Sequence, residues 1–351
     1  MAKRFFTAVA LLTVIILVAA AAISYLYNDM LKPVNPEAVE QYEFVEIPSG
    51  ANTEDIAGIL EHENLIHNQL IFRIFVRRYN LGQGFIAGKY SLSPAMSLSE
   101  IVYIIHSGDV YTETAWFTIP EGYTVEQIAT RLDNEGLADN ERILDLARNP
   151  SENILEIIPF LMEVDDTDID YLLEGYLFPD TYEIYSGSGE EDIVKMMLRR
   201  LDRIIDESSK LRAAELGFSL HEILTIASLV EREAVVDHER SRIAGVIYNR
   251  LAIGQMLQID ATIQYILGET KEFLTYGDLE IPSPYNTYQN TGLPPGPIAA
   301  PGELSIEAAL YPEDTDYFFY NFKYDGTGEH YFSHTYEEHL QNVRRAEENI
   351  Q

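Results

Sequence analysis

The sequence predicts an α+β fold with an N-terminal transmembrane helix, a small module of strands and helices, and a larger mixed domain. Three observations support this prediction. The N-terminal stretch 5–27 carries no charge, a strand–turn–helix pattern occurs twice before residue 132, and a mostly helical region begins near residue 139. We expect the following parts: a cytoplasmic tail and anchor over 1–28, a tether over 29–42, a small module over 43–112, and the main domain over 113–351.

The apolar N-terminal stretch has the length of a membrane-spanning helix. At about 1.5 Å per residue, a helix over 5–27 crosses a hydrocarbon core of about 30 Å. Lys3 and Arg4 precede the stretch and Asp29 follows it, so the positive-inside rule places the N-terminus in the cytoplasm and the rest outside. A cleaved signal peptide is the alternative, because 19–22 are all alanine. The run exceeds the roughly 7 to 15 apolar residues of a signal sequence, so we predict an uncleaved single-pass anchor in the cell membrane.

Composition excludes several classes of function. The hydrophobic fraction of 46% over 351 residues indicates folded domains with cores of their own. The formal net charge of −33 argues against nucleic acid and anionic lipid as partners, because both would be repelled. Cysteine is absent, which rules out thiol catalysis and thiolate metal sites. His221-Glu222 is followed by Thr225 where a zinc-protease helix needs a second histidine, so no metal or cofactor is predicted.

The small module contains the first copy of an internal repeat. Residues 47–60 align without gaps to 119–132. Both begin with Ile-Pro-x-Gly and continue with Ile, Ala and Leu at helical spacing. After the first copy we expect a helix near 68–79, a strand over 88–93 and a helix over 97–107 that begins with a capping box. This order of elements resembles the LysM sugar-binding fold, and a plain packing or spacer domain remains the alternative.

The main domain is predicted to be mostly helical over 139–222, with a break at 174–182. A helix begins after Ser219, with Glu222 completing a capping box, and a second capped helix is expected over about 237–252. Between the helices and the C-terminus, Gln258 and Asp260 alternate as they would on a strand or loop that points both side chains one way. A hairpin is expected over 325–333.

Glu233 is the candidate acid. It follows Val230, Leu229 and Ile226 by three, four and seven residues, so it lies on their apolar stripe. Burial there disfavours the charged carboxylate and raises its pKa, which makes a glutamate a competent general acid near neutrality. Glu231 lies about 200° away around the helix. The alternative is that Glu233 pairs with an arginine, and the nearby candidates are Arg240 and Arg242.

A second run supplies groups that suit a carbohydrate. Residues 285–290 offer aromatic faces for stacking and amides for hydrogen bonds, which are the usual means of holding a sugar and its acetamide. The prolines and glycines of 292–302 restrict the motion of the loop that follows. Besides Glu233, the predicted substrate-binding residues are Gln258, Asp260, Tyr285, Asn286 and Tyr288.

These motifs together resemble the MltG/YceG-like family of membrane-anchored endolytic murein transglycosylases. The matching segments are 174–182 (EGYLFPDTY), 227–233 (ASLVERE), 285–288 (YNTY) and 292–296 (GLPPG). The resemblance implies a YceG-like catalytic domain after the LysM-like segment, and a lyase that needs no cofactor. It implies cleavage of peptidoglycan glycan strands between N-acetylmuramic acid and N-acetylglucosamine, with a 1,6-anhydro end as product and Glu233 as the catalytic acid. It also implies work beside the cell-wall synthases (penicillin-binding proteins), where the enzyme terminates or trims nascent strands.

Two other functions remain open at this point. A muramidase that hydrolyses the same bond needs a second carboxylate, which Asp260 or Glu231 would supply. A non-catalytic peptidoglycan-binding scaffold needs neither acid. The single evident acid favours the lyase, because the 6-hydroxyl of the muramic acid acts as an intramolecular nucleophile and no water has to be activated.

Overall fold

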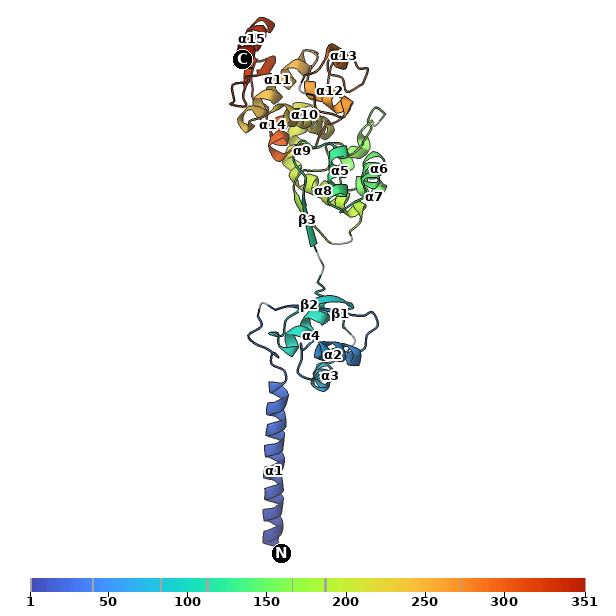
Figure 1. Cartoon of the computed structure of the whole chain (residues 1–351), viewed down its shortest axis with the longest axis vertical. Helices are drawn as coiled ribbons and strands as arrows, with labels where there is room; N and C mark the ends of the chain where they lie inside the picture. Colours follow the sequence, from blue (N-terminus) through green and yellow to red (C-terminus); the bar gives the residue numbers. More distant parts are fainter. Residues whose placement is uncertain are drawn as a thin grey trace. The chain divides into compact units, whose positions relative to one another are not determined.

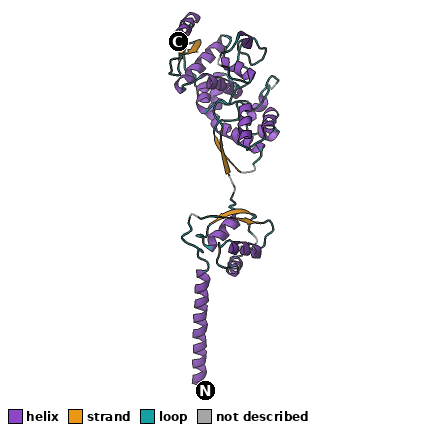
Figure 2. Ribbon diagram, viewed as in Figure 1, coloured by secondary structure: helices purple, strands orange, loops and turns teal. Residues whose placement is uncertain are grey.

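The computed structural model describes residues 2–39, 41–82, 84–111, 114–165, 167–185, 188–271 and 273–350. The chain divides into two compact units, Met1–Glu113 and Thr114–Gln351 (Figure 1). The boundary predicted between residues 112 and 113 falls on residues outside those described. In the described residues helices predominate, and three two-stranded antiparallel sheets accompany them (Figure 2). The predicted mixed α+β class is confirmed.

Helix α1 (Ala2–Asp29) is the candidate membrane span. Its stretch Leu11–Asp29 has a mean hydropathy of 2.0 and none of it is buried in the unit. Its 28 residues correspond to about 42 Å, which is longer than the hydrocarbon core of a bilayer. Helices α9 (Glu207–Leu216) and α10 (Leu220–Glu233) are together apolar enough to span, but they meet at a bend of 89° and α10 is a core helix. The finding is consistent with the predicted single-pass anchor.

The first unit pairs two strands around two helices. Strand β1 (Glu43–Ile47) is antiparallel to β2 (Gly88–Leu92), and α2 (Thr53–His62) and α3 (Gln69–Arg78) lie between them in the chain. Helix α4 (Leu98–Ser107) follows, and the predicted capping box is present. The core consists of apolar side chains from β1, β2, α2, α3 and α4, among them Val45, Ile47, Leu60, Phe72, Tyr90 and Ile101. The predicted order of elements is confirmed, and the LysM-like assignment stays a prediction.

The aligned segments of the internal repeat have the same local structure. Strand β3 (Thr114–Thr118) and helix α5 (Val125–Asn134) repeat β1 and α2. Between strand and helix, Gly50 has φ of 81° and Gly122 has φ of 73°, a conformation that glycine adopts without steric penalty. The second copy has a different partner, because β3 pairs with β4 (Thr181–Tyr185) of the second unit.

Helix α10 is the centre of the second unit. All eight of its residues from 223 to 230 are buried, as expected of a helix surrounded by other elements. It packs against α9, α11 (Arg240–Ala252), α12 (Asp260–Leu267) and α14 (Glu303–Leu310) (Figure 1). The remaining helices before it are α6 (Asn140–Arg148), α7 (Glu152–Leu155), the 3-10 turn η1 (Pro159–Glu163) and α8 (Glu190–Ile204).

Two local predictions near the site need correction. The helix expected from 237 starts at Arg240, after a 3-10 turn η2 (Asp237–Glu239), and no side chain caps it. Asp260 does not alternate with Gln258 along a strand, because it is the first residue of α12. Gln258 has φ of 50°, which re-aims the chain immediately before that helix.

The C-terminal part confirms the predicted hairpin. Strand β5 (Phe319–Phe322) is antiparallel to β6 (His330–Ser333), with Tyr320 opposite Phe332. Helix α15 (Tyr336–Ile350) packs on both strands. The short helix α13 (Tyr276–Leu279) lies in the chain between α12 and α14.

Candidate active site

The end of helix α10 determines where Glu233 lies. The predicted stripe is present, because Ile226, Leu229 and Val230 are all fully buried. Glu233 is the last helical residue, and Ala234 turns the chain into an extended conformation. The side chain is therefore half-buried, at the end of a helix where unpaired carbonyl groups disfavour negative charge.

Glu233 opens into a pocket of about 600 Å³. Three other predicted residues line the same pocket, namely Gln258, Asp260 and Tyr288. Together with Glu233, these residues come from three segments of the chain: the end of α10, the start of α12 and the loop over 285–290. Strand β5 and helix α15 close the remaining side. A pocket with one acid, a second carboxylate, an amide and an aromatic ring has the groups that bind and cleave a sugar.

The pKa of Glu233 is raised from 4.5 to about 7, mainly by burial, and the charge of Asp260 raises it further. A hydrogen bond from Tyr320, the backbone N–H of Ala261 and the charge of Arg232 all lower it. Burial prevails, because it strips water from the charged form while the three opposing contacts replace that water incompletely. A large share of Glu233 is therefore protonated at neutral pH, as a general acid must be.

Neither of the two candidate arginines forms an ion pair with Glu233. Arg240 instead pairs with Glu231 at 3.1 Å, and Arg242 pairs with Glu313 at 3.1 Å. Glu231 also accepts the backbone N–H of Gly302 at 3.0 Å. Glu231 thus faces away from the pocket and is held by other groups. The carboxylates that line the pocket with Glu233 are Asp260 and, on α15, Glu347.

The two sequence segments that hold Asp260 and Tyr288 are tied to each other. The hydroxyl of Tyr288 donates a hydrogen bond to the carboxylate of Asp260. Behind them, the hydroxyl of Thr287 accepts the backbone N–H of Ile259 at 3.0 Å, and the backbone N–H of Gln258 donates to the carbonyl of Thr287 at 3.1 Å. These contacts fix the register of one segment against the other, which is what a preorganised site requires.

The remaining two predicted residues, Tyr285 and Asn286, do not line this pocket. Asn286 is fully buried, and its amide donates to the carbonyls of Leu279 at 3.0 Å and Ile281 at 2.8 Å. Its amide oxygen accepts the backbone N–H of Tyr288 at 2.9 Å, so it shapes the loop that presents Tyr288. Tyr285 is buried and lines a different pocket.

Most residues that line the pocket were not predicted from the sequence, and two of them, Tyr320 and Arg250, make polar contacts that matter for the site. Tyr320 on β5 donates a hydrogen bond to Glu233, and the guanidinium of Arg250 on α11 donates to the carbonyls of Phe318 and Leu257. Arg250 is buried, and the pocket is its nearest open space. The only sequence signal for Tyr320 was its position just before the predicted hairpin, since strand pairing brings that edge to the site.

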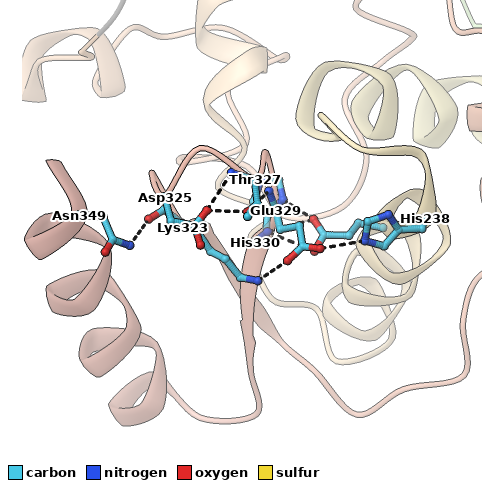
Figure 3. Close-up of polar contacts among 8 residues, drawn as sticks. His238, Lys323, Asp325, Thr327, Glu329, His330 and Asn349 are labelled. Carbon is cyan, nitrogen blue, oxygen red and sulfur yellow. Dashed lines mark hydrogen bonds and ion pairs between the residues drawn. The ribbon is translucent and has the colours of Figure 1, made fainter.

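Polar contacts hold the hairpin in place beside the pocket (Figure 3). Glu329 bridges Lys323 and His238, at 3.3 Å from the His238 Nε2. His330 of β6 donates its backbone N–H to the carboxylate of Glu239, and its Nδ1 lies 2.8 Å from the same group. Asn349 of α15 donates to the carbonyl of Lys323 at 2.6 Å. The hairpin is thus joined to η2 on one side and α15 on the other, which fixes Tyr320 over Glu233.

In the ranges that the structure describes, no three His, Asp or Glu side chains gather closely enough to bind a metal ion.

Comparison with known proteins relates this architecture to one family. The sequence pattern of the YceG-like family matches residues 45–345. An endolytic murein transglycosylase of Bacillus subtilis (strain 168) is 37% identical over 325 residues, which cover 90% of this chain and 88% of that protein. A protein of the same name from Streptococcus pneumoniae serotype 2 (strain D39) is 34% identical over 340 residues, which cover 90% of this chain and 60% of that longer protein. The crystal structure of a YceG-like protein from Listeria monocytogenes is similar with a TM-score of 0.59 and 40% identity, over 86% of this chain and 99% of that one.

Proposed function

Because this chain belongs to the YceG-like family, we propose that it is a membrane-anchored endolytic lytic transglycosylase of peptidoglycan, with Glu233 as its general acid and base. The observation that carries the proposal is an unpaired glutamate, with its pKa raised to about 7, in a pocket that also holds Asp260, Gln258 and Tyr288. Its two relatives named above carry the activity in their names, and the enzyme class is that of a lyase.

The first chemical step uses the protonated form of Glu233. It donates its proton to the glycosidic oxygen between N-acetylmuramic acid and N-acetylglucosamine, and the bond from that oxygen to the anomeric carbon breaks. The N-acetylglucosamine leaves with a free hydroxyl, and positive charge develops on the anomeric carbon and ring oxygen of the muramic acid. The carboxylate of Asp260 lies in the same pocket and stabilises that charge electrostatically.

The second step uses the carboxylate that Glu233 has become. It takes the proton from the 6-hydroxyl of the muramic acid, and the oxygen closes on the anomeric carbon to give the 1,6-anhydro ring. Glu233 ends the cycle protonated, so atoms and protons balance without water. Tyr320 donates its hydrogen bond to the carboxylate form, which eases the first step by stabilising the product of proton transfer.

The other pocket residues hold the sugar. Gln258 is exposed at the pocket and offers both an amide donor and an acceptor for an acetamido group. Tyr288 offers a half-buried ring for stacking. Asn286 acts indirectly, since both donors of its amide are already used by the loop.

We further propose that α1 anchors the enzyme in the cell membrane with the catalytic unit outside, where peptidoglycan lies. Lys3 and Arg4 precede the apolar stretch, so the N-terminus stays in the cytoplasm. In this position the enzyme would terminate or trim nascent glycan strands beside the cell-wall synthases.

The test compares the full chain in detergent with its Glu233→Gln variant on purified peptidoglycan, and mass spectrometry identifies the new glycan ends. We expect 1,6-anhydromuramic ends from the wild type alone. Reducing ends would instead identify a muramidase, for which Asp260, in the same pocket as Glu233, is the second carboxylate to mutate. Intact strands with both proteins would contradict any cleavage and favour a peptidoglycan-binding scaffold.

A further inference from the structure

A second pocket of about 450 Å³ lies beside the first and has no role in the chemistry above. It shares two walls with the Glu233 pocket, the end of α10 and the first turn of α12. Adjacent residues line different pockets, because Glu233 and Asp260 face the first while Arg232 and Ala261 face the second. The backbone N–H of Ala261 also donates to the Glu233 carboxyl. Because the two pockets adjoin along this wall, a linear polymer that crosses it would place neighbouring units in both.

We propose that this second pocket holds an N-acetylated sugar of the same glycan strand, next to the sugars between which Glu233 cleaves. The inference rests on the proposed function and adds a further binding site to it. Three tyrosines line the pocket, Tyr171, Tyr265 and Tyr285, and the ring centroids of the last two are 5.0 Å apart. The amide of Gln264 lies in the same wall. An aromatic face beside an amide is the combination that sugar sites use for the ring and the acetamido group.

Glu174 orients the aromatic wall. Its carboxyl is 2% exposed and accepts the backbone N–H of Val125 at 3.2 Å from both oxygens. It also accepts a hydrogen bond from Tyr265. Burial raises the pKa of Glu174 to about 8, so it is mostly uncharged at neutral pH. This gives a role to the segment 174–182, which was recognised in the sequence but has no part in the acid–base chemistry.

The charge around the pocket favours a neutral occupant over an anionic one. Glu126, Asp170 and Glu269 line it, and among the described lining residues Arg232 is the one cation. Arg232 already donates to the carbonyl of Gly122 at 3.1 Å. Phosphates and carboxylates would be repelled by this rim, whereas an uncharged acetamido sugar would not.

The experiment measures binding of glycan strands to the full chain carrying Glu233→Gln, so that nothing is cut. The strands are freed of peptides by an amidase and separated by length, so that each N-acetylglucosamine is neutral and each muramic acid keeps only its lactyl carboxylate. Into this background we introduce Gln264→Ala and, separately, Tyr265→Leu. The matched control is Gln341→Ala, at an exposed position of α15. Thermal unfolding of each variant identifies any that fails to fold. If Tyr265→Leu fails to fold, Gln264→Ala alone carries the test.

We expect both variants to weaken binding of long strands roughly three- to ten-fold. The shortest strands that still bind should be affected by less than about twofold, because they fill the Glu233 pocket alone. A purely structural role would weaken short and long strands alike, and that result would overturn the inference. Unchanged binding of long strands would also overturn it.

These results separate the inference from the function on which it rests. If the wild type forms anhydro ends but the two variants bind long strands normally, the function stands and the second site is wrong. If length-dependent binding is lost in the variants but the wild type forms no anhydro ends, the site stands and the lyase is wrong. If strands of every length fail to bind, both are wrong.

Discussion

Replacing Glu233 by glutamine should stabilise the folded protein, and the gain should depend on pH. The pKa of Glu233 rises from 4.5 to about 7 on folding. At about 1.4 kcal/mol for each pKa unit, the ionised carboxyl lowers the free energy of unfolding by about 3 kcal/mol. Glutamine keeps the shape and an acceptor for Tyr320 but carries no charge, so Glu233→Gln removes this penalty.

The direction of this pH dependence follows from which state, folded or unfolded, loses the Glu233 proton at the lower pH. Below pH 4.5 the carboxyl is protonated in both states, and the variant gains nothing. Between pH 4.5 and about 7 the unfolded chain releases its proton while the folded one retains it, so the penalty on the wild type grows. Above about pH 7 the penalty is complete and the advantage of the variant is constant.

The assay is thermal unfolding of the second unit, followed in the full chain at several pH values from 4 to 9. For a unit of this size, about 3 kcal/mol corresponds to a rise in Tm of roughly 6–12 °C above pH 7. Glu231→Gln is the matched control two residues away. It breaks the buried pair with Arg240, so it should lower the stability by about 3 to 5 kcal/mol. A difference between wild type and Glu233→Gln that stays the same at every pH would refute the reasoning.

Four further outcomes are expected from the same structure. The rate of anhydro-end formation at low substrate should fall about tenfold per pH unit above pH 7, because Glu233 must begin protonated. Asp260→Asn should move this limb of the pH profile to lower pH and Tyr320→Phe should move it to higher pH, since the two groups shift the pKa of Glu233 in opposite directions; shifts of the same sign would contradict the assignment. Asn286→Ala should lower both activity and Tm, with a loss of about 2 to 4 kcal/mol in urea unfolding, because two backbone carbonyls lose their donor. Gly245→Ala should destabilise the protein by about 1 to 3 kcal/mol in the same assay, because the added Cβ would lie 2.5 Å from the backbone carbonyl oxygen of Glu313. Unchanged stability would show that the segment around Glu313 shifts without cost.

The sequence predicted best those features whose causes lie within a few residues. The capping boxes at Ser97 and Ser219 join groups three positions apart, so the pattern contains the whole interaction. The stripe that buries Glu233 follows from the helical period alone. The glycine turns of the repeat follow from the need for positive φ at Gly50 and Gly122.

The parts of the site that the sequence did not predict depend on contacts between distant segments. Arg250 enters the pocket because α11 packs beside β5, and Tyr320 reaches Glu233 across 87 positions in sequence. No local pattern distinguishes either from an ordinary helix arginine or strand tyrosine. Asn286 was predicted to hold sugar because amides suit sugars, but its donors are taken by carbonyls of the loop after α13. The side-chain type indicates which contacts a group can make, whereas only the fold decides which groups remain free to make them.

Glu231 and Glu233 show how one helix end separates two identical side chains. The helical period turns them about 200° apart, so Glu231 faces α14 and Glu233 faces the pocket. Glu231 pairs with Arg240 and accepts the backbone N–H of Gly302, and these contacts join the end of α10 to the starts of α11 and α14. Glu233 has the same burial without a cation in contact, and the charge of Asp260 nearby. Two carboxyls whose surroundings differ in this way take different roles in a site. Glu233, which is held by hydrogen bonds from Tyr320 and Ala261 and not by an arginine, is the one that can exchange a proton with a substrate.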